Sequence, residues 1–171
     1  TCAVVLPFLY LPSVRLISAS VDNPVAFSWP TKFPPRSNVN SLELFHLREI
    51  FLGQIVSAAR SLQSFHWAWH YNDLFDDGQV HTSIVNLTQL ITGLRHVQDT
   101  LVDLTISENC EIGIGPDFPS ISIQGSLEAL SDFRTLKKLT IPLVLLLGFS
   151  PDTTGRIEIC LPVGLEHLTL T

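Results

Sequence analysis

The sequence contains no methionine, only three cysteines and few charged residues, which make up 15% of its 171 positions. It begins with Thr1, so we expect the chain to be part of a longer protein. The ten lysines and arginines form no run, and the formal net charge is −6. Because binding a nucleic-acid backbone requires clustered cations, we expect no nucleic-acid partner.

The three cysteines, Cys2, Cys110 and Cys160, are too far apart for a Cys-x-x-Cys pair. An odd and widely spaced set is no disulfide framework, and a structural zinc knot needs closer pairs. We therefore expect buried free thiols in a reducing compartment, no metal and no cofactor.

The most apolar run, Leu139–Phe149, is interrupted by Pro142 and Gly148. A membrane-spanning helix needs roughly 20 apolar residues, so this run predicts a core strand followed by a turn, and we expect no membrane partner. No signal-peptide pattern opens the sequence. We expect an intracellular protein, in the cytoplasm or the nucleus.

One stretch of the sequence defines a repeat that recurs along the chain. Residues Leu101–Cys110 read Leu-x-x-Leu-x-Ile-x-x-Asn-Cys, which matches the Leu-x-x-Leu-x-Leu-x-x-Asn/Cys unit of a leucine-rich repeat with isoleucine at the sixth position. Weaker copies of its first six positions occur at Leu11–Leu16, Val39–Leu44, Leu62–Trp67, Leu136–Ile141 and Leu165–Leu170. The fourth positions of the six copies, in order, are Val14, Leu42, Phe65, Leu104, Leu139 and Leu168. Their spacing varies from 23 residues (42 to 65) to 39 residues (65 to 104), so the array is irregular.

Apolar residues at positions four and six of each copy have the period of a strand. One such unit cannot bury its apolar face, so neighbours must stack into a parallel sheet. Apolar residues at helical spacing predict helices over 47–60 and 80–97, and Ser126 is a candidate cap for a third. The prediction is an α/β fold: a single domain over 1–171, an irregular leucine-rich-repeat solenoid with helices and loops behind the sheet. Asn109 is expected to bond the backbone at the bend after its strand.

Positions three, five and seven of each copy should face away from the helices. This register also places Ile17 on that open face. The surface is broad and shallow, which suits a protein partner better than a small molecule; the alternative is a face that is merely solvated. The predicted partner-binding residues are Arg15, Glu43, Phe45, His66, Asp103, Thr105, Lys138, Thr140 and His167.

The chain resembles the leucine-rich-repeat part of fungal F-box-like proteins. The similarity rests on Ser61–Phe65 with the aromatic residues after it, on Thr100–Ile106, on Phe133–Pro142 with the apolar run that follows, and on Leu161–Leu170. In that family an F-box docks a ubiquitin-ligase adaptor and the repeats recruit the substrate. The resemblance therefore implies a substrate receptor rather than an enzyme. The Leu-Pro-x-Glu opening of an F-box has no match in this sequence.

Two alternatives remain. His66, His70 and Asp73 are all possible metal ligands and could serve a metal-assisted hydrolase. On an extended strand, however, His66 and His70 would lie roughly 13 Å apart, too far to share one ion unless the strand ends by Trp69. Trp69 itself could lie in the core or at the lip of the surface. The other alternative is a purely structural segment of a longer solenoid.

The repeat register makes a direct prediction at Leu104. Replacing this inward residue with aspartate removes roughly 1.5–3 kcal/mol of apolar burial and places an unpaired charge in the core. We expect the Leu104→Asp chain not to fold, which circular dichroism and thermal melting would detect. A soluble variant that melts like the parent chain would show that the register is wrong.

Overall fold

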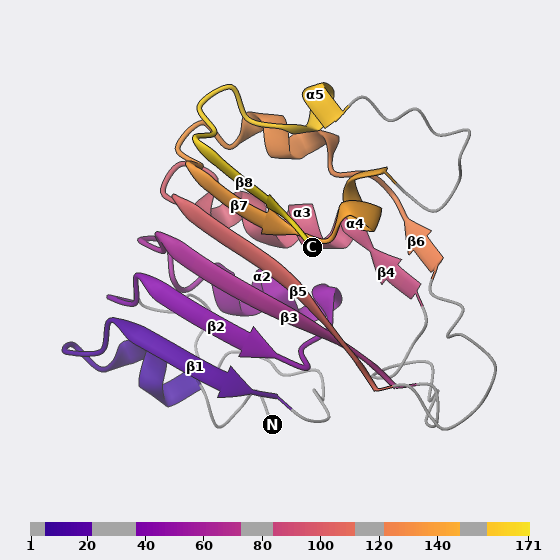
Figure 1. Cartoon of the computed structure of the whole chain (residues 1–171). Coiled ribbons are helices and arrows are strands. Elements are labelled where there is room, and N and C mark those ends of the chain that lie inside the picture. Colours follow the sequence, from indigo (N-terminus) through magenta and orange to yellow (C-terminus); the bar gives the residue numbers. More distant parts are fainter. Residues whose placement is uncertain (1–5, 22–36, 73–83, 112–121, 148–156) are drawn as a thin grey trace.

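The chain folds around one parallel sheet. The computed structural model describes residues 6–21, 37–72, 84–111, 122–147 and 157–171. Six strands lie side by side in chain order (Figure 1), and every neighbouring pair is parallel. They are β1 (Leu16–Ser20), β2 (Ser41–Phe45), β3 (Ser64–Asn72), β5 (Asp103–Glu111), β7 (Lys138–Ile141) and β8 (His167–Leu170). The predicted α/β fold with a parallel sheet is confirmed.

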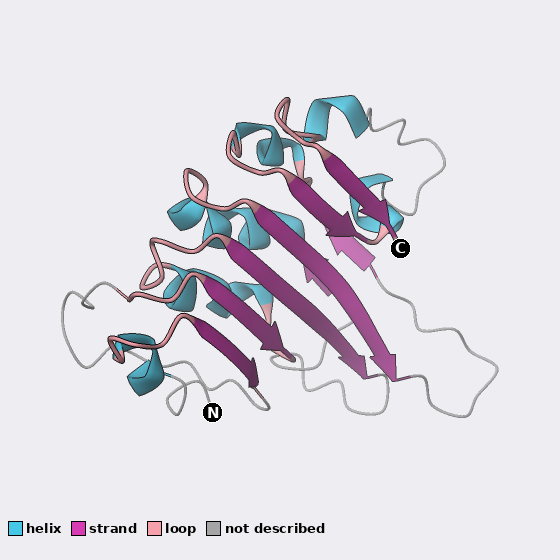
Figure 2. Cartoon of the chain, turned by 60° about the vertical axis from the view of Figure 1, so that its left-hand side comes forward, coloured by secondary structure: helices cyan, strands magenta, loops and turns pink. Residues whose placement is uncertain are grey.

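The helices lie on one side of this sheet (Figures 1 and 2). The α-helices are α2 (Glu49–Val56), α3 (Leu87–Leu94), α4 (Leu143–Leu147) and α5 (Ile157–Cys160). The 3-10 turns are η1 (Leu6–Tyr10), η2 (Arg95–Val97) and η3 (Glu128–Asp132). A second, two-stranded parallel sheet pairs β4 (Ile84–Asn86) with β6 (Ser122–Gln124). Within the described part of the chain, no helix has the length and apolarity needed to cross a membrane.

The core lies between the sheet and the helices. Positions four and six of the second to fifth copies point into it and are at most 1% exposed; they are Leu42, Leu44, Phe65, Trp67, Leu104, Ile106, Leu139 and Ile141. The Trp67 indole N–H donates a hydrogen bond to the Leu47 carbonyl at 2.7 Å, so its one polar atom is satisfied inside the core. Trp69 is also buried, which removes it as a surface contact.

A repeated hydrogen-bond pattern sets the register at the start of the strands. The carbonyl of Arg15 accepts from the backbone amides of both Asn40 and Ser41. The carbonyls of Asn40, Gln63, Val102 and Lys137 each accept in the same way from two successive amides of the next strand along the sheet. The same donor–acceptor pattern therefore occurs at all five junctions of the six-stranded sheet.

The predicted register of the first copy is wrong by three residues. Ile17, not Val14, pairs with Leu42, and Ala19 pairs with Leu44. Ile17 is consequently a buried core residue rather than an open-face one. The spacing of residues 11–16 matches the repeat, but residues 11–15 form the turn between η1 and β1, where the Val14 amide donates to the Leu11 carbonyl, and Leu16 begins β1.

The helix expected over 80–97 is also shorter and begins differently. Residues 80–83 lie outside the described part, 84–86 form β4, and only Leu87–Leu94 is α-helical. The side chain of Asn86 accepts from the Gln89 amide and so caps the helix at its start. Ile84 belongs to the apolar stripe, but Ile84 and Val85 are β-branched and pair with β6.

Four smaller expectations turn out differently or need refinement. β5 continues to Glu111, so Asn109 lies within a strand and not at a bend. After β7 and Pro142 the chain forms helix α4 rather than only a turn. The segment after Ser126 is a 3-10 turn without a side-chain cap.

Of the cysteines, Cys160 is a buried free thiol whose pKa is raised by burial and by the nearby charge of Glu128; Cys2 lies outside the described residues.

Helices α2 and α3 pack closely because each has a glycine at the contact. A Cβ atom on Gly93 would lie 2.9 Å from the backbone nitrogen of Gly53, closer than side-chain atoms pack.

A buried ion pair lies near the start of α2. Arg48 donates to both carboxylate oxygens of Glu49, and the Asn86 amide donates to one of them at 3.2 Å. The carboxylate thus ties α2 to the start of α3.

The glycine contact predicts unequal effects of two similar substitutions. Gly93→Ala gains about 1 kcal/mol of helix propensity but overpacks the contact, which typically costs about 1–3 kcal/mol. In Gly53→Ala the new Cβ would lie 3.4 Å from the nearest atom, the Cα of Gly93. We expect urea denaturation to show a lower free energy of unfolding for Gly93→Ala and, because Gly53 also lies inside a helix but has room for the new methyl group, a value up to about 1 kcal/mol higher for Gly53→Ala. Equal effects would contradict the close approach.

Candidate functional site

The candidate site is the open face of the sheet, the face opposite helices α2 and α3 (Figure 2). Strand pairing aligns its side chains in rows that cross the strands. One row runs Ser18, Glu43, His66, Thr105, Thr140 and Thr169; a second runs Leu16, Ser41, Ser64, Asp103, Lys138 and His167. With strands roughly 4.8 Å apart, six strands extend over roughly 24 Å. A third row runs Ser20, Phe45, Ala68 and Ser107, so eight of the nine predicted residues lie together on this face.

Arg15 is the exception. The three-residue shift of β1 places it before the strand, where its guanidinium donates to the Asn38 carbonyl at 3.1 Å. Its side chain therefore braces the loop before β2 instead of standing in a row of the open face. The open-face positions of β1 belong to Leu16, Ser18 and Ser20, which the sequence pattern did not identify.

The centre of the open face is held together by contacts between strands. The rings of Phe45 and His66 meet edge to face, with their centroids 5.4 Å apart. His66 Nε2 and Ser107 Oγ are 2.8 Å apart and share a hydrogen bond. Ala68 lies between Phe45 and Ser107 in the register and is buried. This cluster, Phe45–His66–Ser107, joins β2, β3 and β5 by side chains as well as by backbone.

Charges of both signs are spread over the open face. Glu43 lies opposite His66, and Asp103 lies opposite Lys138, which is followed by His167. Beside the face, Lys137 and Glu166 form an ion pair at 2.8 Å between the segments that precede β7 and β8. The hydrogen bond from Lys137 lowers the pKa of the Glu166 carboxyl. The face thus offers charged, polar and aromatic contacts, without a field of one sign.

The possible metal cluster at His66 is only partly visible. β3 remains extended through Asn72, so the α-carbons of His66 and His70 lie roughly 13 Å apart. Asp73 and the side chain of His70 lie outside the described residues. Among the side chains that are described, no three histidines, cysteines or carboxylates are grouped to hold a metal ion.

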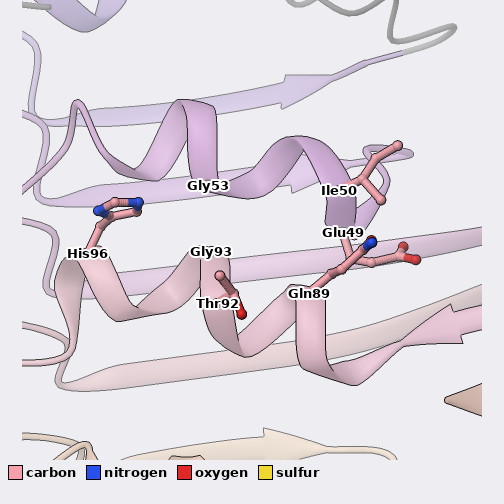
Figure 3. A pocket seen from close by; sticks show the side chains of 7 residues that line it. All are labelled: Glu49, Ile50, Gly53, Gln89, Thr92, Gly93 and His96. Carbon is pink, nitrogen blue, oxygen red and sulfur yellow. The ribbon is translucent and has the colours of Figure 1, made fainter. Parts of the chain in front are cut away.

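A small cavity of about 260 Å³ lies on the helix side, between α2 and α3 (Figure 3). It is lined by Glu49, Ile50, Gly53, Gln89, Thr92, Gly93 and His96. Glu49 and Gln89 lie at one end and His96 at the other. The Glu49 carboxylate is already bonded to Arg48 and to the Asn86 amide, and the Thr92 hydroxyl donates to the Thr88 carbonyl. Glu49 and Thr92 thus make their hydrogen bonds within the helix layer itself.

Comparisons of the chain with protein-family models, with curated proteins and with solved structures found no match.

The central cluster predicts a measurable coupling between two strands. In a double-mutant cycle of His66→Ala and Ser107→Ala, we expect a coupling free energy of about 0.5–1.5 kcal/mol, the usual net value of a hydrogen bond. Urea denaturation of the parent, the two single variants and the double variant measures it. A matched cycle of Ser64→Ala and Ser107→Ala, which share no hydrogen bond, should give a value near zero. Additive losses in the first cycle would contradict the bond.

Proposed function

We propose that this chain is an irregular leucine-rich-repeat solenoid that binds a protein partner through the open face of its sheet, as the substrate-binding part of a ubiquitin-ligase receptor. The observation that carries the proposal is the set of rows of polar and aromatic side chains on the open face, with the Phe45–His66–Ser107 cluster at their centre. The proposal makes the chain a binding module and assigns it no catalytic residue.

The repeating backbone pattern supports a solenoid. Five successive carbonyls, from Arg15 to Lys137, accept two amides each from the following strand. Inward apolar pairs recur beside them, as at Leu104 and Ile106. In repeat proteins each unit contacts mainly its neighbours, and the stack creates an extended binding surface. Units of unequal length fit such a stack, because the backbone register at the start of each strand is the same at every junction of the six-stranded sheet.

The chemistry of the face supports a protein as the occupant. A small ligand is usually enclosed by a concave and mostly apolar pocket, whereas this face presents neighbouring side chains on parallel strands. Protein interfaces concentrate their binding energy in aromatic and arginine side chains surrounded by polar contacts. Phe45 is half-buried against His66, so it is ordered before a partner arrives. Glu43, Asp103 and Lys138 lie in the other two rows of the open face and supply charge for orientation.

The ligase role extends the proposal through the resemblance to fungal F-box-like proteins. In such a receptor an F-box elsewhere in the full-length product would contact the ligase adaptor, and the present chain would contact the substrate. This part of the proposal is tested separately: the full-length product should co-purify with a ligase adaptor. Failure to do so would leave general protein binding as the function.

The binding proposal predicts that the double variant His66→Ala/Thr105→Ala loses its partner. Both side chains are removed from the centre of the open face, where truncation of an interface hot spot typically costs 2 kcal/mol or more, about thirtyfold in affinity. Quantitative mass spectrometry of material bound to the immobilised chain measures the recovery of each interactor. The same protein should be recovered with the parent and depleted with the variant.

The matched control is Gln89→Ala/Thr92→Ala, which removes two exposed side chains from α3 on the helix side. It should retain the partner at the parental level. Melting curves of both double variants distinguish lost contacts from lost folding. Equal recovery by the open-face variant and the parent would place the binding site elsewhere.

A further inference from the structure

The Glu43 carboxylate on the open face is partly buried and has no hydrogen bond or ion pair with any described residue. The Arg15 guanidinium donates to the Asn38 carbonyl instead, and the Arg48 guanidinium is bonded to a carboxylate of α2. Lys138 lies three strands away, roughly 14 Å across the sheet, which exceeds the Debye length of about 8 Å in physiological salt. A charge that is already partly removed from water gains more from pairing than a fully exposed one.

The Phe45 ring lies on the same strand and the same face as this carboxylate. Residues two apart on a strand point the same way, so the Cβ atoms of Glu43 and Phe45 lie roughly 7 Å apart. The ring is half-buried and is held by its edge-to-face contact with His66. The Nε2 atom of His66 shares its hydrogen bond with Ser107 on β5, on the side away from β2. An ordered aromatic ring and an unpaired carboxylate are therefore neighbours on the open face.

We propose that Glu43 and Phe45 form a binding site for an arginine side chain of the partner protein. This inference rests on the proposed function and names the chemistry that the open face recognises. The guanidinium stacks on the exposed part of the Phe45 ring and donates two parallel N–H bonds to the Glu43 carboxylate. A guanidinium makes both contacts at once, because its N–H groups lie in its plane and leave its faces free for stacking. A lysine ammonium, which is compact and strongly hydrated, does not.

The surroundings of Glu43 favour a cation at this place over any other on the open face. Its neighbours in the row are Ser18 and His66, so no second carboxylate and no lysine stands beside it. Asp103, the other described carboxylate of the face, lies opposite Lys138, and the next outward residue of its strand is Thr105 rather than an aromatic residue. The formal net charge of −6 attracts a cationic segment to the chain in general. The ring beside Glu43 makes the attraction specific.

The probe is N-acetyl-arginine methylamide, titrated into the full chain and followed by two-dimensional NMR. The amide signals of Glu43 and Phe45 should shift and saturate at millimolar concentrations. The citrulline counterpart has the same shape without the charge, and it should bind at least about tenfold more weakly, because the charged hydrogen bonds and the cation–π contact are lost. The lysine counterpart should also bind more weakly than the arginine compound. Equal binding of the arginine compound and either counterpart would overturn the proposal.

Variants of the chain locate the site. Glu43→Gln should bind the arginine compound no better than the citrulline compound, and Phe45→Leu should bind it at least about threefold more weakly than the parent does. The matched control is Glu108→Gln, which removes the same charge from an exposed position of β5 beside Trp69, on the other side of the sheet. It should bind like the parent. Equal losses in Glu43→Gln and Glu108→Gln would show only a general attraction to negative charge and contradict the site. If a variant does not fold, the comparison of the compounds on the parent chain still decides.

Capture of the partner protein separates this inference from the proposed function. Glu43→Gln should deplete the protein that the immobilised parent chain captures, and Glu108→Gln should retain it. A partner that is lost from His66→Ala/Thr105→Ala but fully retained by Glu43→Gln would support the proposed function and exclude the arginine site. Binding of the arginine compound by a parent chain that captures no protein would support the arginine site and contradict the proposed function.

Discussion

Parallel register is the constraint on which the rest of this structure depends. It is set where each strand begins, by one carbonyl that accepts two amides from its neighbour, and it recurs from Arg15 to Lys137. Once this register holds, the period of two along each strand places apolar pairs such as Leu104 and Ile106 in the core. The same period aligns polar residues in rows on the open face. Core and surface are therefore two results of one backbone arrangement.

Two specific contacts hold the helices together behind the sheet. The glycine pair allows α2 and α3 to approach, and the buried Arg48–Glu49 pair joins the start of α2 to the amide of Asn86. A buried carboxylate needs such partners, because an unpaired charge is strongly disfavoured in a low-dielectric interior. The repeated geometry of the sheet thus coexists with connecting segments of unequal length and type.

The repeat spacing in the sequence correctly predicted the inward residues of the inner strands. Leu104 and Trp67 occupy positions four and six of their copies, and both are fully buried in the structure. The sequence patterns gave a wrong prediction where the same local spacing is compatible with two different secondary structures or registers. Residues 11–16 fit the repeat spacing, yet pairing across the sheet chose Ile17 and Ala19. The stripe through Ile84 suits a helix, yet β6 pairs with those residues as a strand. The link between His66 and Ser107 joins residues 41 positions apart, which no local periodicity encodes.

The close approach of Gly53 and Gly93 also affects the curvature of the molecule. Strands lie roughly 4.8 Å apart, whereas packed helices usually need 8–10 Å between axes. In repeat proteins, a layer of wide helices behind a layer of narrow strands curves the sheet, with the open face on the inside of the arc. Where two glycines bring α2 and α3 together, this difference is smaller. The sheet is therefore expected to be flattest between β2 and β5, beneath Phe45 and His66, so a partner there would meet an even plane and not a hollow.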